Sequence, residues 1–132
     1  MTVCTAGRRP VFKDRDFGYL CVDLLSDLSH KTGVKVFGYC LMPDHVHLLL
    51  EATAGFDVVQ FVAIWKSKCY LLRRGHGSKD RIWQRSFHDH ALRSDEAVRR
   101  VAEYIVANPV RAGLVSDARD YPLGGSFEFE LW

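Results

Sequence analysis

The sequence predicts an α+β fold in one domain, with a mostly antiparallel sheet and helices packed on one face of it. Three observations predict this class. Two long segments repeat their apolar residues at helical spacing, and two neighbouring apolar runs are parted only by Pro43 and Asp44. Strands and helices also alternate too loosely for a parallel sheet with short crossovers. The 132 residues, 48% of them hydrophobic, suit a single domain spanning 1–132.

The first half of the chain predicts a strand, a helix and a pair of strands. Residues 3–5 form a short first strand. From Asp16 the apolar residues recur at helical spacing, and Gly33 is a typical helix stop. The runs 34–42 and 45–52 predict two strands, which we expect to pair as neighbours because a tight connection separates them.

The second half predicts two more helices with a strand between them. Residues 57–73 carry an apolar stripe at helical spacing, and a basic, glycine-containing loop follows. Residues 82–92 are a plausible strand. Ser94 is a typical N-cap for a third helix that runs to about Asn108, where Pro109 ends it. The closing "FEFELW" predicts an extra edge strand or interface strand.

Composition argues against several classes of protein. The four cysteines form no C-x-x-C pair, so the sequence favours buried free thiols in a reducing cytoplasm over a zinc knuckle or a redox motif. No apolar stretch reaches the roughly 18 residues needed to cross a bilayer. The first residues lack an apolar signal core, so we expect a cytoplasmic protein without a membrane partner.

Charge is unevenly distributed, although the net charge is only +2. Seven basic residues between positions 66 and 85 are opposed only by Asp80. They are Lys66, Lys68, Arg73, Arg74, Lys79, Arg81 and Arg85. Such a block predicts a phosphate-binding face, as in nucleic-acid-binding proteins. The alternative is an ordinary solvated helix end and loop.

Two histidines stand out in the run "YCLMPDHVHLLLEA". Because strand side chains alternate, His45 and His47 point to the same face, roughly 6–7 Å apart along the strand. That spacing lets both imidazoles converge on one metal ion, whereas burying two unpaired imidazoles would be costly. The alternative is a structural role. A rival pair, His88 and His90, has polar flanks and suits an exposed strand end or a phosphate-contacting edge.

The third helix supplies a second set of chemical groups. Arg100, Tyr104 and Asn108 follow one another at four-residue intervals along one helix edge. Tyr104 could simply be an amphipathic edge residue. A phenol, with an ordinary pKa of about 10, is a poor nucleophile near neutral pH. It would need a metal-polarised electrophile or a base nearby.

Three motifs together resemble the Y1 transposases of the IS200/IS605 type, and most closely their REP-associated tyrosine transposase branch. They are "MPDHVHLLL", "IWQRSF" and "YIVANPVRAGLV", and the resemblance runs from about residue 3 to 122. It implies a ferredoxin-like or RRM-like antiparallel sheet with helices. It also implies an enzyme that cuts and rejoins hairpin-containing single-stranded DNA through a 5′-phosphotyrosine link, leaving a free 3′-hydroxyl. IS200-type members work as dimers, so a homodimer is one expectation, and REP-associated members can be monomeric.

The resemblance also implies roles for individual residues. His45 and His47 match the HUH motif that binds Mg²⁺ or Mn²⁺, Tyr104 matches the nucleophile, and Asn108 matches a polar residue that can complete the metal site. The basic block, with Arg100, would track the DNA backbone, and Trp83 and Phe87 could stack on bases, although Trp83 could equally belong to the core. Arg111 could hold a phosphate near the nucleophile or face the end of the helix.

Two other functions compete with this one on the sequence alone. One is a non-catalytic nucleic-acid-binding module built on an RRM-like sheet. The other is a small metal-dependent hydrolase that uses the histidines and water, with Tyr104 merely structural. Pairing of "DHVH" with "YIVANPV" in one chain favours the transposase over both.

Overall fold

A computed structural model describes residues 2–5, 9–52, 55–75, 82–88 and 95–131 of the chain. The elements in order are β1 (Thr2–Thr5), η2 (Val11–Lys13), α1 (Arg15–Thr32), β2 (Lys35–Met42), β3 (His45–Glu51), α2 (Val58–Gly75), β4 (Trp83–His88), α3 (Asp95–Val106), α4 (Asn108–Arg111), η3 (Ala118–Asp120) and β5 (Gly124–Gly125). Within these ranges no helix is both long and apolar enough to cross a lipid bilayer.

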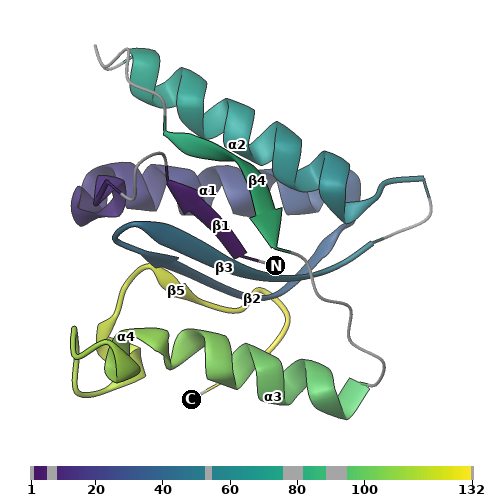
Figure 1. The fold of residues 1–132 in the computed structure, drawn as a ribbon. Coiled ribbons are helices and arrows are strands. Elements are labelled where there is room, and N and C mark those ends of the chain that lie inside the picture. Colours follow the sequence, from purple (N-terminus) through teal and green to yellow (C-terminus); the bar gives the residue numbers. More distant parts are fainter. Residues whose placement is uncertain (1, 6–8, 53–54, 76–81, 89–94, 132) are drawn as a thin grey trace.

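The strands form one antiparallel sheet in the order β4-β1-β3-β2-β5 (Figure 1). The expected pairing of the two central runs is confirmed, since β2 and β3 form a hairpin in which Met42 lies opposite His45. The predicted α+β class with a ferredoxin-like antiparallel sheet is therefore confirmed. The sheet brings β1, the first strand of the chain, between β3 and β4.

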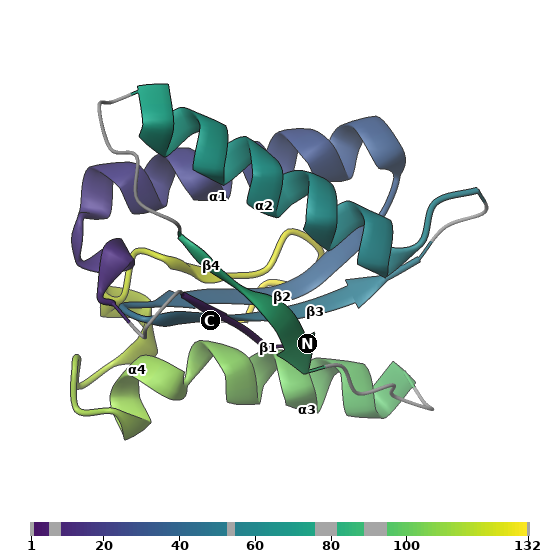
Figure 2. The same ribbon diagram turned by 45° about the horizontal axis from the view of Figure 1, so that its top comes forward.

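Helices cover both faces of the sheet, which differs from the expected single helical layer. Figure 2 shows α1 and α2 on one side of the sheet and α3 on the other. The strand β2 explains the difference. Its side chains are buried on both faces at Cys40, Leu41 and Met42, so each face needs a cover.

Two separate cores follow from this arrangement. The α1/α2 core is the cluster of buried side chains on that face, including Leu25, Leu41, Val46 and Trp65. The α3 core is the smaller cluster of buried side chains on the opposite face: Cys40, Met42, Leu49, Ala102 and Ile105. Because β2 and β3 alternate their side chains, they contribute to both cores.

Helix α1 begins and ends at the signals expected of it. The Asp14 carboxylate accepts a hydrogen bond from the Phe17 backbone N–H at 3.2 Å, which caps the first turn. Gly33 ends the helix in the left-handed conformation, with φ of 76°, and its N–H donates to the Ser29 carbonyl at 2.9 Å. Helix α2 also lies where the spacing predicts it.

The third helix and the tail differ from expectation in their details. Helix α3 ends at Val106, and Pro109 lies in the first turn of α4, where the missing proline N–H costs nothing. The tail is not an edge strand. The edge pairing is made earlier, by Gly124 and Gly125 against β2, while Phe129 packs on the α3 core. The stretch 89–92, expected to continue β4, lies outside the described residues.

Candidate active site

His45 and His47 lie on the α3 face of the sheet. Their neighbours across the hairpin, Met42 and Cys40, belong to the α3 core, whereas the intervening Val46 belongs to the α1/α2 core. The two imidazole rings are 4.8 Å apart between centroids and meet edge to face at 88°. Both side chains are partly buried. The expectation that they share one face and lie side by side is therefore confirmed.

Each imidazole has a distinct electrostatic setting. The Nδ1–H of His45 donates to the Asp44 carboxylate at 2.7 Å, which leaves the Nε2 lone pair for another partner. Burial, with smaller contributions from the charges of His45 and Arg111, lowers the pKa of His47 to about 4. His47 is therefore neutral near pH 7, as a metal ligand or hydrogen-bond acceptor must be.

Tyr104, Asn108 and Arg111 form a compact group where α3 passes into α4. The Tyr104 side chain is 63% exposed, and the Arg111 guanidinium carbon lies 3.7 Å from the centroid of its ring. Arg111 Nη2 also donates to the Tyr104 carbonyl at 2.8 Å and to Asn108 Oδ1 at 2.7 Å. The Asn108 amide nitrogen donates to the Ile105 carbonyl at 2.9 Å. The turn after α3 is thus fixed by side chains.

Arg111 links this group to the histidines. Its charge lowers the pKa of His47, and it also opposes the rise in the pKa of the neighbouring Cys40 thiol, which burial raises to about 12. In both ribbon views, α4 and the end of α3 lie at the same end of the sheet as the hairpin that leads into His45 (Figures 1 and 2). The segments that carry the phenol, the guanidinium and the imidazoles therefore lie at one end of one face.

The donor set bears on metal binding. The described residues contain no group of three or more His, Cys, Asp or Glu side chains that could hold an ion. The chain thus offers two imidazoles, one of them backed by a carboxylate, and an Asn108 amide oxygen that already accepts one hydrogen bond but has a second lone pair. This set fits a hard cation that keeps waters and takes oxygens from a substrate.

The basic block does not gather around the histidines. Lys66, Lys68, Arg73 and Arg74 lie on α2, which covers the opposite face of the sheet (Figure 2). Lys66 Nζ donates to the Gln84 carbonyl at 3.1 Å and so ties α2 to β4. Lys79 and Arg81 lie outside the described residues, as do His90 and the side chains of Arg85, Phe87 and His88. Arg100 is exposed on α3, on the same side of the sheet as the histidines.

Trp83 belongs to the α1/α2 core and not to a DNA-facing surface. Its side chain is 6% exposed, and its indole N–H donates to the Lys66 carbonyl at 3.0 Å. The ring packs 5.4 Å from Trp65 and 5.8 Å from Phe12 between centroids. An indole enclosed in this way has no free face for a base, so of the two alternatives for Trp83 the structure supports the core position and not stacking on DNA.

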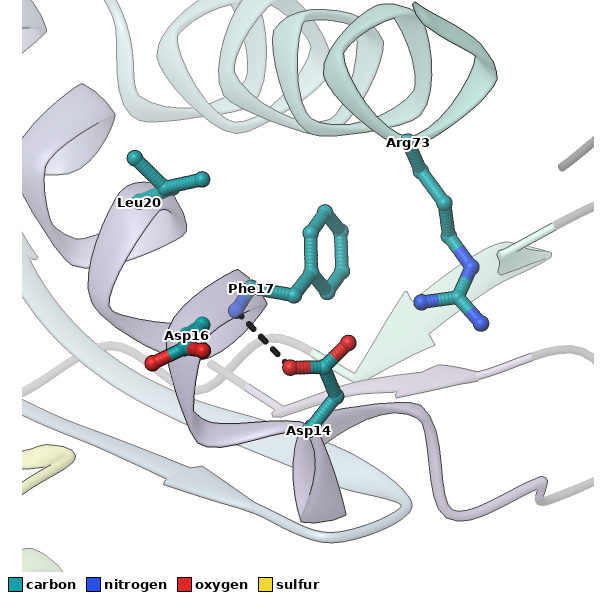
Figure 3. A pocket seen from close by; sticks show the side chains of 5 residues that line it. All are labelled: Asp14, Asp16, Phe17, Leu20 and Arg73. Carbon is teal, nitrogen blue, oxygen red and sulfur yellow. Dashed lines mark hydrogen bonds between the residues drawn. The ribbon is translucent and has the colours of Figure 1, made fainter. Parts of the chain in front are cut away.

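Arg73 lines a pocket of about 310 Å³ between α1 and α2. Figure 3 shows Arg73 extending from α2 towards Phe17, with the capping carboxylate of Asp14 below the ring. The guanidinium carbon of Arg73 lies 5.0 Å from the Phe17 ring centroid, and Asp16 and Leu20 complete the lining. Two carboxylates beside one guanidinium make this pocket a poor site for a phosphate.

Sequence reasoning missed two features of the site. The sequence pattern marks Asp44 only as part of a tight connection. An acid directly before a candidate metal-binding histidine is nevertheless a signal that its carboxylate could orient the imidazole ring. The stacking of Arg111 on Tyr104 depends on the turn at Ala107 that joins α3 to α4, and no spacing rule in the sequence predicts that turn.

Comparison with known proteins identifies the family. The family model described as "Transposase IS200 like" matches residues 1–108. A REP-associated tyrosine transposase of Escherichia coli (strain K12) is 30% identical over 88 residues, which is 67% of this chain and 52% of that protein. The ISDra2 transposase TnpA of Deinococcus radiodurans is 43% identical over 44 residues, which is 33% of this chain and 31% of that protein.

The fold is also that of a solved relative. A REP-associated tyrosine transposase bound to a REP hairpin superposes with a TM-score of 0.74 at 22% identity, covering 93% of this chain and 72% of that one. The chain spans about half the length of the curated REP-associated relatives it matches. With a family model that covers most of the sequence, and with the histidine pair and the tyrosine helix on one face, this chain belongs to the IS200-like transposase family.

Proposed function

We propose that this chain cuts and rejoins hairpin-containing single-stranded DNA, with Tyr104 as the nucleophile and a 5′-phosphotyrosine intermediate. One observation carries the proposal. Arg111 stacks on the Tyr104 ring and its charge acts on His47, so the candidate nucleophile and the candidate metal ligands have a common neighbour. Membership of a transposase family supports the same reaction.

The partner is proposed from the neighbouring structure. That relative is a REP-associated tyrosine transposase bound to a REP hairpin, and its fold matches 93% of this chain. A hairpin-containing single strand is therefore the substrate to test first. Arg100 and Arg111, two exposed cations on α3 and α4, are candidates for phosphate contacts on that face.

His45 and His47 would hold the metal ion, Mg²⁺ or Mn²⁺, with Asn108 as a further oxygen donor. When bound, such an ion neutralises charge that develops on the scissile phosphate. Asp44 keeps the His45 ring in the tautomer whose Nε2 can act as a ligand. The remaining positions are left to water and phosphate oxygens, as hard cations favour.

The covalent step uses the phenol of Tyr104. Its oxygen forms a bond to phosphorus, the bond from phosphorus to the deoxyribose 3′-oxygen breaks, and the phenol proton leaves for solvent or a base. The 3′-oxygen takes up a proton and becomes a free hydroxyl, while the phosphate stays on the 5′ end of the downstream strand. Attack by a 3′-hydroxyl on the phosphotyrosine reverses these changes and reseals the strand. No external energy source is needed because the phosphotyrosine link replaces the phosphodiester bond.

A covalent-adduct assay tests the nucleophile. Labelled single-stranded hairpin DNA is incubated with the protein and Mn²⁺, and denaturing gels are searched for a protein–DNA species. We expect Tyr104→Phe to abolish the adduct while leaving DNA binding largely intact. Tyr19→Phe, which changes another exposed tyrosine on α1, is the matched control. Adduct at normal yield with Tyr104→Phe would refute the assignment.

The same assay separates the competing functions. Salt-sensitive binding that is indifferent to a chelator, with no cleavage, would favour a non-catalytic binding module. Cleavage that survives Tyr104→Phe and leaves no adduct would favour a hydrolase. Each result would replace the proposal.

A binding measurement tests the metal ligands without relying on activity. Titration of the protein with Mn²⁺, followed by electron paramagnetic resonance of the free ion, gives the affinity directly. We expect His45→Ala and His47→Ala each to weaken Mn²⁺ binding at least about tenfold. Removing only the groups that support a metal ligand already lowers metal affinity by about this factor. His30→Ala, an exposed histidine at the end of α1, should bind as the wild type does. Equal affinity in all four proteins would remove the histidines from the metal site.

A further inference from the structure

A second pocket, of about 210 Å³, is lined in part by residues that are close in sequence to the candidate active site. Its lining residues come from the start of α1, the β2–β3 turn and the segment after α4. Figure 1 shows these three segments at the same end of the sheet. Phe12, Pro43, Leu114 and Tyr121 contribute to its lining. Pockets for drug-sized ligands have volumes of roughly 300–1,000 Å³, so this one suits a single ring system.

Hydrogen bonds fix the walls of this pocket. The backbone N–H of Phe12 donates to the Pro43 carbonyl at 3.0 Å, which joins η2 to the hairpin turn. The Tyr121 hydroxyl donates to the Leu41 carbonyl at 2.6 Å, and the Leu41 N–H donates to the Leu123 carbonyl at 2.8 Å. A pocket whose walls are held in this way is formed before any ligand arrives, which lowers the entropy cost of binding.

Two cations line the same pocket. Lys13 and Arg15 are both exposed, and neither side chain makes a hydrogen bond or an ion pair with any residue in the described ranges. Arg15 lies close enough to Tyr121 for its charge to lower the pKa of that phenol, against the larger effect of burial. Apolar and aromatic walls with two available cations match a nucleotide, which has a planar base and an anionic phosphate.

The pocket adjoins both halves of the candidate site. Pro43 precedes His45 by two residues, at the other end of the hairpin turn. Leu114 follows Arg111 by three residues, just beyond α4. A DNA strand whose phosphate lies at the imidazoles therefore has the pocket within reach of its neighbouring nucleotide.

We propose that this pocket binds one base of the single-stranded DNA next to the scissile phosphate, with Lys13 and Arg15 on the adjoining phosphate. The inference rests on the proposed function and adds to it a subsite for the nucleotide beside the scissile phosphate. The apolar walls accept a stacked base, and the cations hold the backbone at that step.

Photocrosslinking tests the position of the base without requiring cleavage. Single-stranded hairpin DNA carrying one 5-iododeoxyuridine, moved stepwise along the strand, is irradiated with the full chain, and crosslinked peptides are identified by mass spectrometry. We expect a crosslink on the peptide containing Tyr121 at one or two adjacent positions of the iodinated base. Crosslinks confined to other peptides would overturn the inference.

Two matched substitutions test occupancy of the pocket. Leu114→Trp fills this pocket, and Leu20→Trp fills the pocket between α1 and α2, each starting from an exposed leucine that lines it. We expect Leu114→Trp to reduce the Tyr121 crosslink at least tenfold and Leu20→Trp to leave it unchanged. An equal effect of both, or none from Leu114→Trp in a protein that melts like the wild type, would contradict the proposal.

Salt dependence tests the cations. Removing one phosphate contact to single-stranded DNA should reduce the slope of log affinity against log salt by about 0.7. We expect this change in Arg15→Gln and in Lys13→Gln, measured by fluorescence anisotropy. Lys35→Gln, at the far end of β2 from the hairpin, should keep the wild-type slope. Unchanged slopes in all three variants would refute the phosphate contact. Because the adduct assay is separate, loss of the adduct alone would point to Tyr104 and not to this subsite.

Discussion

Gly38 sets how closely the helix bearing Tyr104 approaches the sheet. A Cβ added at Gly38 would lie 3.2 Å from Ala102 Cα and 3.4 Å from Ala102 Cβ. Ordinary carbon contacts begin at about 3.5–4.0 Å, so α3 would have to move outward by a few tenths of an ångström. Ala102 is fully buried in the α3 core, and the contact is with backbone, which cannot rotate away.

The substitution Gly38→Ala should therefore destabilise the protein. Overpacking in a core destabilises a protein by roughly 1–3 kcal/mol. Alanine also reduces the conformational entropy of the unfolded chain, which offsets about 0.4–1 kcal/mol of this loss. A net loss of about 1–2 kcal/mol corresponds to a fall in Tm of about 4–8 °C for a chain of this size. Because the same movement shifts Tyr104, we also expect less covalent adduct from the folded variant.

Thermal and urea denaturation measure this loss, and Gly75→Ala is the matched control. Among the described residues, no heavy atom beyond the chain neighbours and the helix's own backbone lies within 4 Å of a Cβ added at Gly75, the last residue of α2, so that variant should stay within about 0.5 kcal/mol of the wild type. A double-mutant cycle with Ala102→Gly should show coupling, because that change removes one of the two close contacts. If Gly38→Ala is as stable as Gly75→Ala, the close packing of α3 on β2 is refuted.

Three further predictions concern single side chains. Arg111→Ala should raise the pKa of His47 from its value of about 4, because the guanidinium charge helps to hold it down; NMR titration of the imidazole measures this, and an unchanged pKa would separate Arg111 from His47. Burial raises the pKa of Tyr121 to about 12, so its contribution to stability is full below the ordinary tyrosine pKa of about 10 and is lost as the pH rises to about 12. In Tyr121→Phe, the free energy of unfolding measured in urea should no longer change with pH across that window. The variant should also lose about 1 kcal/mol of stability with the hydrogen bond to Leu41, and an unaltered pH profile would count against this role of the phenol. Burial also raises the pKa of the Cys40 thiol to about 12, so iodoacetamide at pH 8 should spare it in the native protein and modify it in urea, with peptide mass spectrometry as the readout; rapid native alkylation would disagree with its burial.

Much of the fold follows from local sequence signals. The Asp14 cap and Gly33 stop bound α1, and the apolar run of β2 next to β3 predicts the hairpin that carries the histidines. Alternation alone was enough to put His45 and His47 on one face, because a strand fixes the direction of every second side chain.

The remaining features depend on tertiary packing, which the sequence does not display. The apolar stretch at the end of β2 is compatible with burial on one face or on two, and only the position of α3 decides between them. A tryptophan at position 83 looks the same in the sequence whether its ring stacks on DNA or, as in the structure, fills a core. Lys66, Lys68, Arg73 and Arg74 lie on α2, and the charge pattern alone does not show that this helix covers the face opposite the histidines.

The division into two cores has a consequence for how the protein opens. Helix α3 is held by a small cluster and by the tail, where Arg99 donates to the Glu130 carbonyl and Phe129 packs against Phe37. The larger cluster on the far face has no buried side chain in common with it, although the partly buried Tyr121 packs against both. We therefore expect the helix that bears Tyr104 to detach from its face while the β2–β3 hairpin stays folded, so that its amide protons exchange with deuterium well before those of α1.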